Sequence, residues 1–550
     1  MNSSTAVVRL VAGLVLGLGL LTGSVPEASA EIKAAGKKGL FTKVNGKTSG
    51  SCRSGICKIS GGTAAGKNLF QRFRRFDTRG EIKSVEFDVI GKKNLIVGVT
   101  SAQGSFIDKS IELNSSANLY WLSPGGIHLG QGASFVNVPN LTLSTANTLR
   151  FGNRGFDVFR SNASELSGLT GQPLQGSLGL VVDPESDAAG GVSRAGIYLD
   201  GIDVFIDESL YVDAIDDALT VRSSTVSLDS SDTVGGSLTL TGESVDLGGT
   251  TRLSATGANG GGAIQVGGSW QNGDASVRQA TTTTVGADVV IDASSTRIGD
   301  GGEIVVWSDI DHAESLTDVS GSLLSIGGVK GGNGGRIETS GLLLSLSSDL
   351  DVRAHALDGK PGLWLQDPYE YWITREGALP LLKALELGSN VTISTGVYRS
   401  SAGNLVTQEA PNDIFLVFPF EKKVGSSDVT LTLEAGGDIY IQDDIISTSG
   451  SLGIAAKSKG SIIVSSDVEL NSAGGDIVLW SNTGDVDSGD GEHYIHLGEG
   501  LRLTSSGGKI VLAGGGDLDR DGFPDGYAYV GTAVMPPPWC FGWNVFAVWD

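Results

Sequence analysis

The chain has 550 residues, which is long enough for several globular domains, but its composition argues against ordinary enzyme domains. Glycine contributes 82 residues, about twice its usual share, whereas Pro (14), Cys (3) and Met (2) are scarce and charged residues make up only 18%. The hydrophobic share of 40% supports a large core, so disorder and a collagen-like chain are disfavoured. The formal net charge of −23 argues against nucleic acid as a partner, because phosphate groups would be repelled.

The first 30 residues are predicted to be a secretory signal peptide. Residues 10–21 form an apolar segment that is too short to span a bilayer in the mature protein. Ala28 and Ala30 form the small-residue pattern that precedes signal-peptide cleavage, so we expect the mature chain to begin at Glu31. An uncleaved membrane anchor is the alternative.

Two of the cysteines, Cys52 and Cys57, are close enough in sequence to close a small loop. In the oxidising compartment that a signal peptide implies, a disulfide is favoured over two free thiols. No further Cys or His lies nearby, which disfavours a metal site, and Cys540 is left as the odd cysteine.

Charge is distributed unevenly along the mature chain. Residues 31–93 contain 15 Lys or Arg and 5 Asp or Glu, a net charge of +10, which leaves −33 for residues 94–550. The basic segment is either an electrostatic handle for an acidic partner or a solvated start of the chain.

Apolar residues alternate with polar ones over much of the chain, as in residues 202–206, 238–240, 264–266 and 429–433. This period of two predicts strands with one buried face. Helical periodicity is nearly absent, and residues 377–387 are the main exception.

A phrase of two glycines, one polar or small residue and an apolar alternation recurs along the chain. The glycine pairs are at 235–236, 261–262, 301–302, 334–335, 436–437, 474–475 and 507–508. We expect each pair to turn a corner with positive φ before a strand, so that stacked units share one continuous core. This indicates an all-β solenoid, with an irregular β-sandwich as the alternative.

The N-terminal third carries several phrases in one fixed order. They are the phrase at 66–73 with Phe76 and Asp77, the strand-like run at 94–100, the run at 117–127, and the run at 130–135. Together they resemble the haemagglutination-activity domain of filamentous haemagglutinin-like exoproteins, which are exported by two-partner secretion. The resemblance is clearest over residues 59–160 and diffuse beyond them, although residues 362–369 and 435–441 also resemble phrases common in these exoproteins.

The match departs from the family pattern in two turns. Ser123, Pro124, Gly125 and Gly126 stand where the family usually has Asn-Pro-Asn-Gly. A second family phrase, Asn-Pro-Asn-Leu, is approximated by a run containing Asn137, Pro139 and Asn140. These departures affect the turn chemistry more than the family assignment.

The resemblance implies a fold, an export route across the outer membrane and a transport partner. The fold is a right-handed parallel β-helix with an N-terminal capping and secretion domain. The route crosses the outer membrane through a β-barrel transporter whose periplasmic domains bind the N-terminal domain of the exported chain. Scarce disulfides suit a chain that stays unfolded in transit.

We divide the chain on this basis. The expected parts are a signal peptide (1–30), a two-partner-secretion domain (31–230), β-helix repeats (231–365), an insertion with a short helix (366–427), further coils ending in an Asp-rich loop (428–534), and a Pro/Trp tail (535–550). The tail is interpreted as a surface-retention hook, as a truncated end or as an unstructured tail.

Twelve residues are candidates for recognition by the transporter. They are Asn68, Phe70, Phe73, Phe76, Asn118, Ser123, Pro124, Gly125, Gly126, Asn137, Pro139 and Asn140. The three phenylalanines would engage the transporter while the chain is unfolded, with strand edges adding β-augmentation. The alternative is that they only cap the first coil.

An Asp-rich segment near the C-terminus is the best local candidate for a ligand. Asp517, Asp519, Asp521 and Asp525 supply carboxylates at alternating positions around Gly522, a pattern that suits Ca²⁺. The Glu that closes an EF-hand loop is missing, so the segment is closer to shorter extracellular calcium loops, and a plain acidic turn is the alternative.

Other motifs are weaker. Residues 61–67 match a phosphate-binding loop pattern, but strand signals replace the required helix, so we interpret the match as a coincidence. His493 and His496 would lie on opposite faces of a strand, which disfavours a shared metal. Seven carboxylates crowd residues 200–217 without a Lys or Arg, and we expect a solvated acidic face.

The sequence therefore favours a non-enzymatic, adhesin-like exoprotein that is secreted or displayed at the outer membrane. Its expected partners are the transporter and a receptor or glycan on a host or neighbouring cell, with Ca²⁺ as the one candidate cofactor and no nucleic acid. The stalk of a contact-dependent toxin system is the first alternative, and a carbohydrate-active β-helix enzyme the second.

Overall fold

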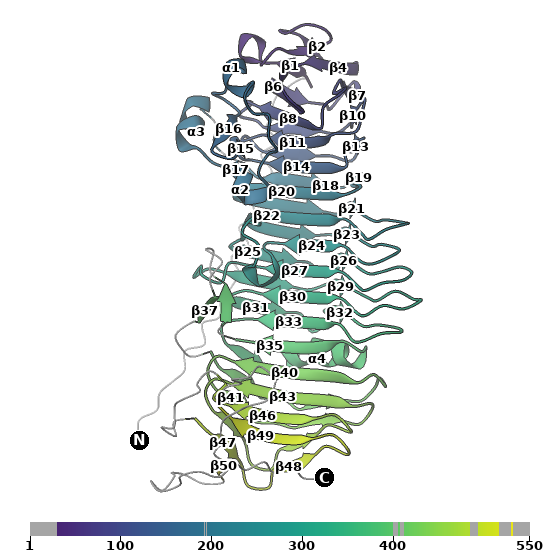
Figure 1. Ribbon diagram of the computed structural model, residues 1–550, viewed down its shortest axis with the longest axis vertical. Coiled ribbons are helices and arrows are strands. Elements are labelled where there is room, and N and C mark those ends of the chain that lie inside the picture. The colour runs from purple at the N-terminus through teal and green to yellow at the C-terminus, as the bar shows by residue number, and fades with distance from the viewer. Residues whose placement is uncertain are drawn as a thin grey trace, which may run out of the picture.

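The computed structural model describes residues 30–191, 193, 195–395, 397–399, 405–407, 412–483, 493–515 and 530–531. Strands stack along one long axis, with the N-terminal coils at one end and the later coils following in chain order toward the other (Figure 1). Almost all pairings between coils are parallel. The predicted all-β parallel β-helix is confirmed, and the irregular sandwich is excluded.

The first wall of the helix runs from the N-terminal coils to the last described coil. Its strands are β6 (Asn68–Asp77), β8 (Asn94–Val99), β11 (Asn118–Leu122), β14 (Asn140–Ser144), β20 (Ser209–Arg222), β22 (Ser237–Gly248), β24 (Ala263–Val266), β27 (Glu303–Trp307), β30 (Arg336–Ser340), β33 (Leu363–Asp367), β35 (Asn390–Ser394), β40 (Val429–Ala435), β43 (Leu452–Ser458), β46 (Ile477–Ser481) and β49 (Ile510–Gly514).

The second wall meets the first through long strands that bend at a corner. β20 pairs with β14 through its first half and with β18 through its second half. The further strands of this wall are β9 (Ser105–Ile107), β12 (Ile127–Leu129), β18 (Ile197–Asp200), β25 (Thr282–Val285), β28 (Leu316–Val319) and β31 (Leu343–Leu346).

The third wall consists of short parallel strands. They are β4 (Gly55–Gly61), β7 (Ile82–Phe87), β10 (Ser110–Leu113), β13 (Ser134–Val136), β19 (Asp203–Phe205), β21 (Thr225–Ser227), β23 (Arg252–Ser254), β26 (Val290–Asp292), β29 (Ser322–Leu324) and β32 (Asp351–Arg353). From β21 to β32, each of these strands is followed by a loop that projects from the helix (Figure 1).

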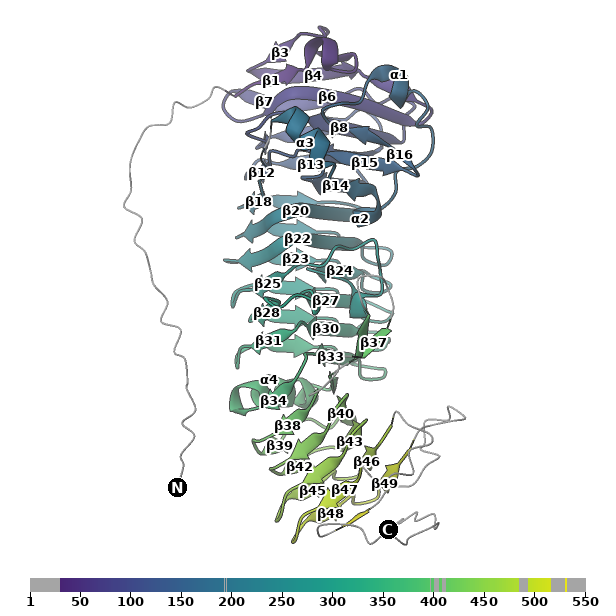
Figure 2. The same cartoon turned by 90° about the vertical axis from the view of Figure 1, so that its left-hand side faces the viewer.

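The first wall is continuous, but the other walls are built from different strands before and after one helix, α4 (Arg375–Glu386). The sequence predicts this helix at residues 377–387. Its apolar face buries Ala378, Leu381, Ala384 and Leu385 against the solenoid. The coils beyond it (Figure 2) use β34 (Tyr371–Ile373), β38 (Ile414–Leu416), β41 (Ile439–Ile441), β44 (Ile462–Val464), β47 (Ile495–Leu497), β50 (Val530–Gly531), β39 (Phe420–Lys422), β42 (Ile445–Ser447), β45 (Glu469–Asn471) and β48 (Arg502–Thr504).

Further elements close the N-terminal end or leave the helix. The cap contains β1 (Ile32–Ala34), η1 (Gly36–Lys38), β2 (Thr42–Val44), β3 (Ser51–Cys52) and β5 (Thr63–Ala65). Between β14 and β18 the chain forms β15 (Thr148–Phe151), β16 (Arg154–Asp157), α1 (Ala163–Leu166), α2 (Gly176–Gly179), β17 (Leu180–Val181) and α3 (Pro184–Gly190). The remaining pieces are η2 (Trp270–Asn272), β36 (Val397–Arg399) and β37 (Leu405–Thr407).

The core is a column of apolar side chains inside the walls. Leu238, Ile264, Ile304 and Ile337 occupy one register position of successive first-wall strands, and each is 0% exposed. Burying each such side chain stabilises the fold by roughly 1.5–3 kcal/mol. The period of two is therefore a consequence of one face meeting this column.

The reason expected for the glycine pairs is wrong in the coils between β21 and β33. Gly261 and Gly262 lack positive φ; a Cβ on Gly261 would lie 1.7 Å from the Ala293 carbonyl oxygen, and one on Gly262 2.1 Å from that of Gly236. These glycines are needed because the backbones of successive coils approach closely. In the C-terminal coils, Gly474 and Gly507 adopt positive φ, as expected, whereas neither Gly436 nor Gly437 does.

Candidate functional site

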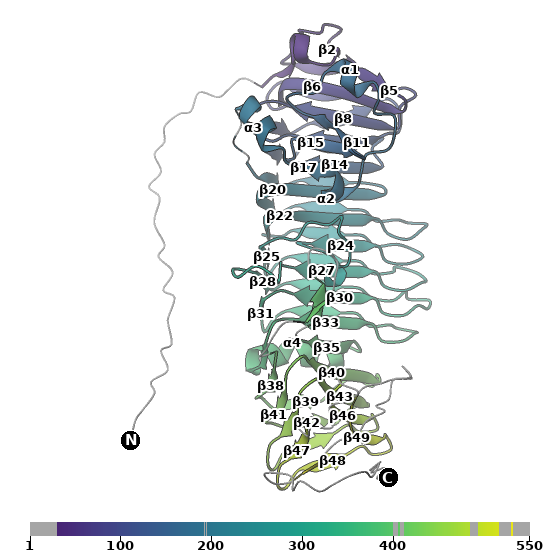
Figure 3. The same ribbon diagram turned by 60° about the vertical axis from the view of Figure 1, so that its left-hand side comes forward.

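The predicted recognition residues lie on the N-terminal coils, at strands β6, β11 and β14 and the turns beside them. Most of this region faces either the core or the segment between β14 and β18, which packs on the outside of the first wall (Figure 3). The structure thus shows what each predicted residue does in the folded chain.

Asn68, Asn118 and Asn140 belong to one ladder of side-chain amides, together with Asn94. The amide nitrogen of each later member donates to the amide oxygen of the member before it, at 2.8 Å, 3.0 Å and 3.0 Å. At the N-terminal end Asn68 donates to the carbonyl oxygens of Leu169 and Gly171. The ladder ties four coils together and holds the outer segment in place.

Phe73 and Phe76 are both 0% exposed and point into the helix. A spacing of three would place them on opposite faces of a flat strand, but β6 bends from the first wall to the second between them. Phe76 meets the ring of Trp121 edge-on at a centroid distance of 4.5 Å. Both side chains are therefore inaccessible once this region is folded.

Phe70 is also 0% exposed, but it faces the other side of β6. It lies in a second apolar cluster with Phe151 and Phe156, at ring-centroid distances of 5.7 Å and 5.6 Å. This cluster fixes the outer segment to the first wall.

The turn at residues 123–126 depends on close backbone packing. The Ser123 hydroxyl donates to the Gly126 carbonyl oxygen at 2.8 Å, and Gly126 has a φ of 99°. A Cβ on Gly125 would lie 2.3 Å from the Ser101 carbonyl oxygen. The departure from the family phrase is thus accommodated by two glycines next to Pro124.

The second turn places Asn137 in the left-handed region, with a φ of 62°. Its amide nitrogen donates to the Leu113 carbonyl oxygen at 2.7 Å, and the Pro139 carbonyl oxygen accepts from the backbone of Glu208 and Ser209. Asn tolerates this conformation better than most residues, which accounts for its use here.

Arg72 is a key residue that sequence reasoning missed. The residue is 3% exposed, and its guanidinium donates to the carbonyl oxygens of Lys38, Asp157 and Ser161 at 2.8–2.9 Å. Burial lowers the pKa of Arg72 to about 10, so the side chain stays charged at neutral pH. It links the cap, β6 and the outer segment.

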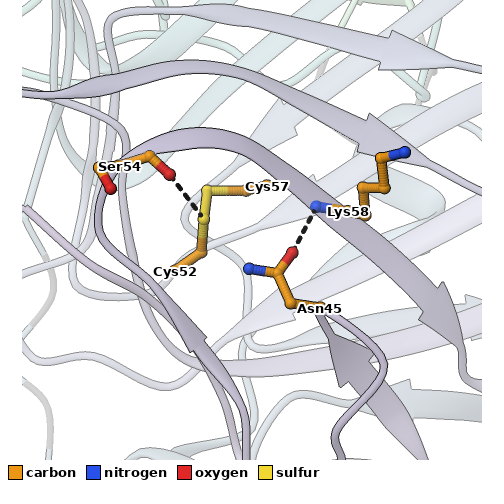
Figure 4. Close-up of a disulfide and its surroundings, with 5 residues drawn as sticks. All are labelled: Asn45, Cys52, Ser54, Cys57 and Lys58. Carbon is orange, nitrogen blue, oxygen red and sulfur yellow. Dashed lines mark hydrogen bonds between the residues drawn. A yellow bond between two sulfur atoms is a disulfide. The ribbon is translucent and has the colours of Figure 1, made fainter.

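Cys52 and Cys57 form a disulfide in the cap, with a Cα–Cα distance of 5.7 Å (Figure 4). The loop beside it is held by the Asn45 side chain, whose oxygen accepts from the backbone nitrogen of Lys58 at 3.0 Å. The disulfide closes a loop of a few residues only, so it does not tie distant parts of the chain together.

The acidic stretch at residues 200–217 is solvated except at one position, where the expectation is wrong. Asp213 is 0% exposed and accepts from Nε of Arg278 at 3.2 Å and 3.3 Å. Burial raises the pKa of Asp213 to about 6 despite this partner. The pairing residue is 65 positions away, which is why local sequence context did not reveal it.

A stack of aromatic rings on the second wall is a further feature that the sequence did not indicate. Phe106, His128 and Tyr198 stack across three strands at 4.8 Å and 4.7 Å, and Arg79 lies 3.9 Å from the Phe106 ring centroid. Burial and the nearby Arg79 charge lower the pKa of His128. The stack shows that coils also adhere through their outer faces.

Several predicted sites fall outside the described residues. They are Ala28 of the cleavage pattern, Cys540, and the calcium candidates Asp517, Asp519, Asp521 and Asp525. Ala30 is the first described residue. Within the described part of the chain, no group of three or more His, Cys, Asp or Glu is arranged to hold a metal ion.

The phosphate-loop pattern at residues 61–67 lies in the hairpin between β4 and β6. Across the described ranges, no helix has the length and apolar character needed to cross a membrane.

Comparison with known protein families identifies the N-terminal part of the chain. Residues 42–177 match the family model described as the TPS secretion domain. The matched range contains every predicted recognition residue as well as Arg72 and the disulfide. No curated protein matches the chain.

Proposed function

We propose that this chain, a secreted two-partner secretion exoprotein with an N-terminal TPS domain, acts outside the cell as a non-enzymatic, adhesin-like rod. The TPS domain implies an outer-membrane transporter as partner. A long parallel β-helix with repeated faces is suited to multivalent contact with a receptor or glycan on another cell. The rod remains attached to the outer membrane or is released.

The burial of the predicted recognition side chains supports a mechanism of export. Phe70, Phe73 and Phe76 are each 0% exposed, and Asn68 and Asn118 are committed to the amide ladder. A transporter therefore meets these groups only before the chain folds. Folding outside the cell then withdraws them into the core and the ladder, which favours release and forward movement.

Folding of the first coils gains free energy because it buries these side chains. Burying three phenylalanine side chains contributes roughly 1.5–3 kcal/mol each. The transporter contacts and the folded contacts compete for the same side chains, so folding of the first coils opposes return through the pore.

We predict that replacing Asn118 and Pro124 together by Ala abolishes release to the medium in cells that express the transporter. Periplasmic and medium fractions are compared by immunoblot. Asn390→Ala is the matched control, because the Asn390 side chain also bonds the next coil, through the backbone nitrogen of Thr430, but lies outside the TPS domain. Undiminished release of the double variant, or equal loss in the control, would contradict the mechanism.

A binding assay distinguishes recognition of the phenylalanines by the transporter from a purely structural role in the fold. A synthetic peptide of residues 59–93 is titrated with the periplasmic domains of the transporter, with and without Phe70→Ala and Phe73→Ala. Weaker binding of the substituted peptide supports recognition of the unfolded chain. Equal binding assigns the phenylalanines to the fold alone.

A further inference from the structure

A polar groove crosses the outer face of the first wall beside the TPS domain. It encloses about 470 Å³ and is floored by β11, β14, β20, β22 and β24, which are hydrogen-bonded neighbours. Adjacent strands are about 4.8 Å apart, so the floor extends over roughly 19 Å. A groove of this length accommodates a short chain molecule lying across the strands.

One side of the groove is built from two segments that are distant in sequence. The segment at α2 meets the loop of residues 274–277, where the backbone nitrogen of Ser177 donates to the Ser276 carbonyl oxygen at 2.8 Å and the Ser177 hydroxyl donates to that of Ala275 at 2.8 Å. A Cβ on Gly176 would lie 1.9 Å from the Ser276 oxygen, so only glycine allows this approach. This side of the groove is thus preformed.

The floor presents hydroxyl and amide groups in two rows. The first row is Asn118, Asn140, Ser209 and Ser237, and the second is Tyr120, Thr142, Tyr211, Thr239 and Gln265. The hydroxyls of Tyr120, Thr142 and Ser237 make no hydrogen bond to any other residue that the structure describes. These groups are available to donate to and accept from a ligand.

The charge of the lining limits the ligand. No Lys or Arg is among the lining residues, and Asp274 is their one carboxylate, its oxygen already accepting from Ser276. Burial raises the pKa of Tyr120 and Tyr211, which are neutral at physiological pH. An anionic ligand finds no cation to pair with, so a neutral ligand fits best.

A peptide strand fits poorly. Each central floor strand is already paired on both sides, so no free edge is available for β-augmentation. A hydroxyl-rich ligand instead matches both the donors and the acceptors of the floor, and the tyrosine rings supply apolar contact.

We infer that this groove binds a neutral oligosaccharide of several sugar residues. The inference deepens the adhesive role proposed above and rests on it, because it assigns the contacted glycan to one site. Binding is measured on the purified mature protein, so a failure of export and a failure of the groove give different results.

The test uses an array that carries neutral oligosaccharides, sialylated and sulfated oligosaccharides, and extended peptides. We expect the full mature protein to bind at least one neutral oligosaccharide. Ser237→Trp fills the groove from an exposed position and should reduce that binding at least tenfold. Tyr120→Phe removes one hydroxyl while keeping the ring, and should weaken binding roughly 2- to 10-fold.

Thr284→Trp is the matched control. Thr284 is an exposed outward residue of β25, outside the groove, so the same bulky change should leave binding intact. Equal melting temperatures of the two Trp variants show that folding is preserved. The proposal is overturned if no neutral oligosaccharide binds, if binding is confined to anionic glycans or peptides, or if Ser237→Trp binds as the wild type does.

A cell-binding assay keeps the two proposals apart. If the Ser237→Trp protein still adheres to cells, the adhesive role stands and the groove is not its site. If the wild-type protein binds the array but not cells, the groove stands and the adhesive role fails.

Discussion

Glu338 and Asp367 bury two carboxyl groups on neighbouring strands of the first wall, and both are 0% exposed. Glu338 accepts from the backbone nitrogen of Gln271 at 2.8 Å and from the Ser340 hydroxyl at 3.0 Å. Burial raises the pKa of Glu338 to about 8, and it raises the pKa of Asp367 well above its ordinary value, with the nearby Glu338 charge adding to the effect. The two side chains are accommodated more easily as neutral acids than as carboxylates.

This arrangement predicts that the protein is more stable in mild acid than at pH 8. Between pH 4.5, the ordinary pKa of Glu, and the folded pKa of about 8, the unfolded chain loses a proton that folded Glu338 keeps, so rising pH favours unfolding. The melting temperature, followed by circular dichroism, should fall over this range and fall less steeply in Glu338→Gln. The exposed control Glu314→Gln should keep the wild-type slope, and a Glu338→Gln protein with an unchanged slope would contradict the assignment.

At the residue scale, sequence reasoning identified positions better than it identified partners. Family phrases indicate Asn68, Asn118 and Asn140 as candidates, but the ladder depends on coil lengths of 22 to 26 residues between the bonded amides. The Asp213–Arg278 pair also joins different coils, and its two residues are 65 positions apart. Contacts between coils are set by register, and a local pattern carries no information about register.

At the element scale, most strands were predictable because the column of buried side chains imposes a period of two on every wall. The stretch between β14 and β18 was not, because it packs on the outside of the first wall through isolated residues such as Phe156 and Leu180 and lacks a periodic pattern. The glycine pairs are predictable from the sequence, but between β21 and β33 their role lies in the distance between backbones of successive coils, which the sequence of one coil cannot show.

We therefore predict that Gly261→Ala is destabilising although the residue needs no unusual φ. Its Cβ would meet the Ala293 carbonyl oxygen at 1.7 Å and the Gly302 backbone nitrogen at 2.4 Å, so neighbouring coils must move apart. Overpacking of this kind costs roughly 1–3 kcal/mol, which should lower the melting temperature by roughly 1–3 °C in a chain of this length. Gly171→Ala, where nothing lies within 4 Å of an added Cβ, is the control and should melt as the wild type does.

At the scale of the whole molecule, the N-terminal coils are built differently from the last coils that the structure describes. The N-terminal coils are covered by the antiparallel pairings of β1, β3 and β5 with β6 or with each other, and by the second apolar cluster around Phe70. Among the described residues, the first-wall strands β46 and β49 pair only with strands of neighbouring coils, and all these pairings are parallel. In a solenoid each coil contacts only its neighbours, so stability is local and an end coil opens without the rest.

This asymmetry predicts a gradient of hydrogen exchange along the rod. Backbone amides of β46 and β49 should exchange at least tenfold faster than those of β11 and β14, because opening the coils of β46 and β49 breaks contacts to neighbouring coils, whereas opening those of β11 and β14 must also break the outer cluster that Tyr120 and Leu122 contact. Exchange is followed by mass spectrometry of peptides from the intact mature protein. Replacing both Cys52 and Cys57 by Ser should speed exchange in β3 and β4 and leave β46 unchanged. Uniform exchange in all coils would instead show that the rod opens as one cooperative unit.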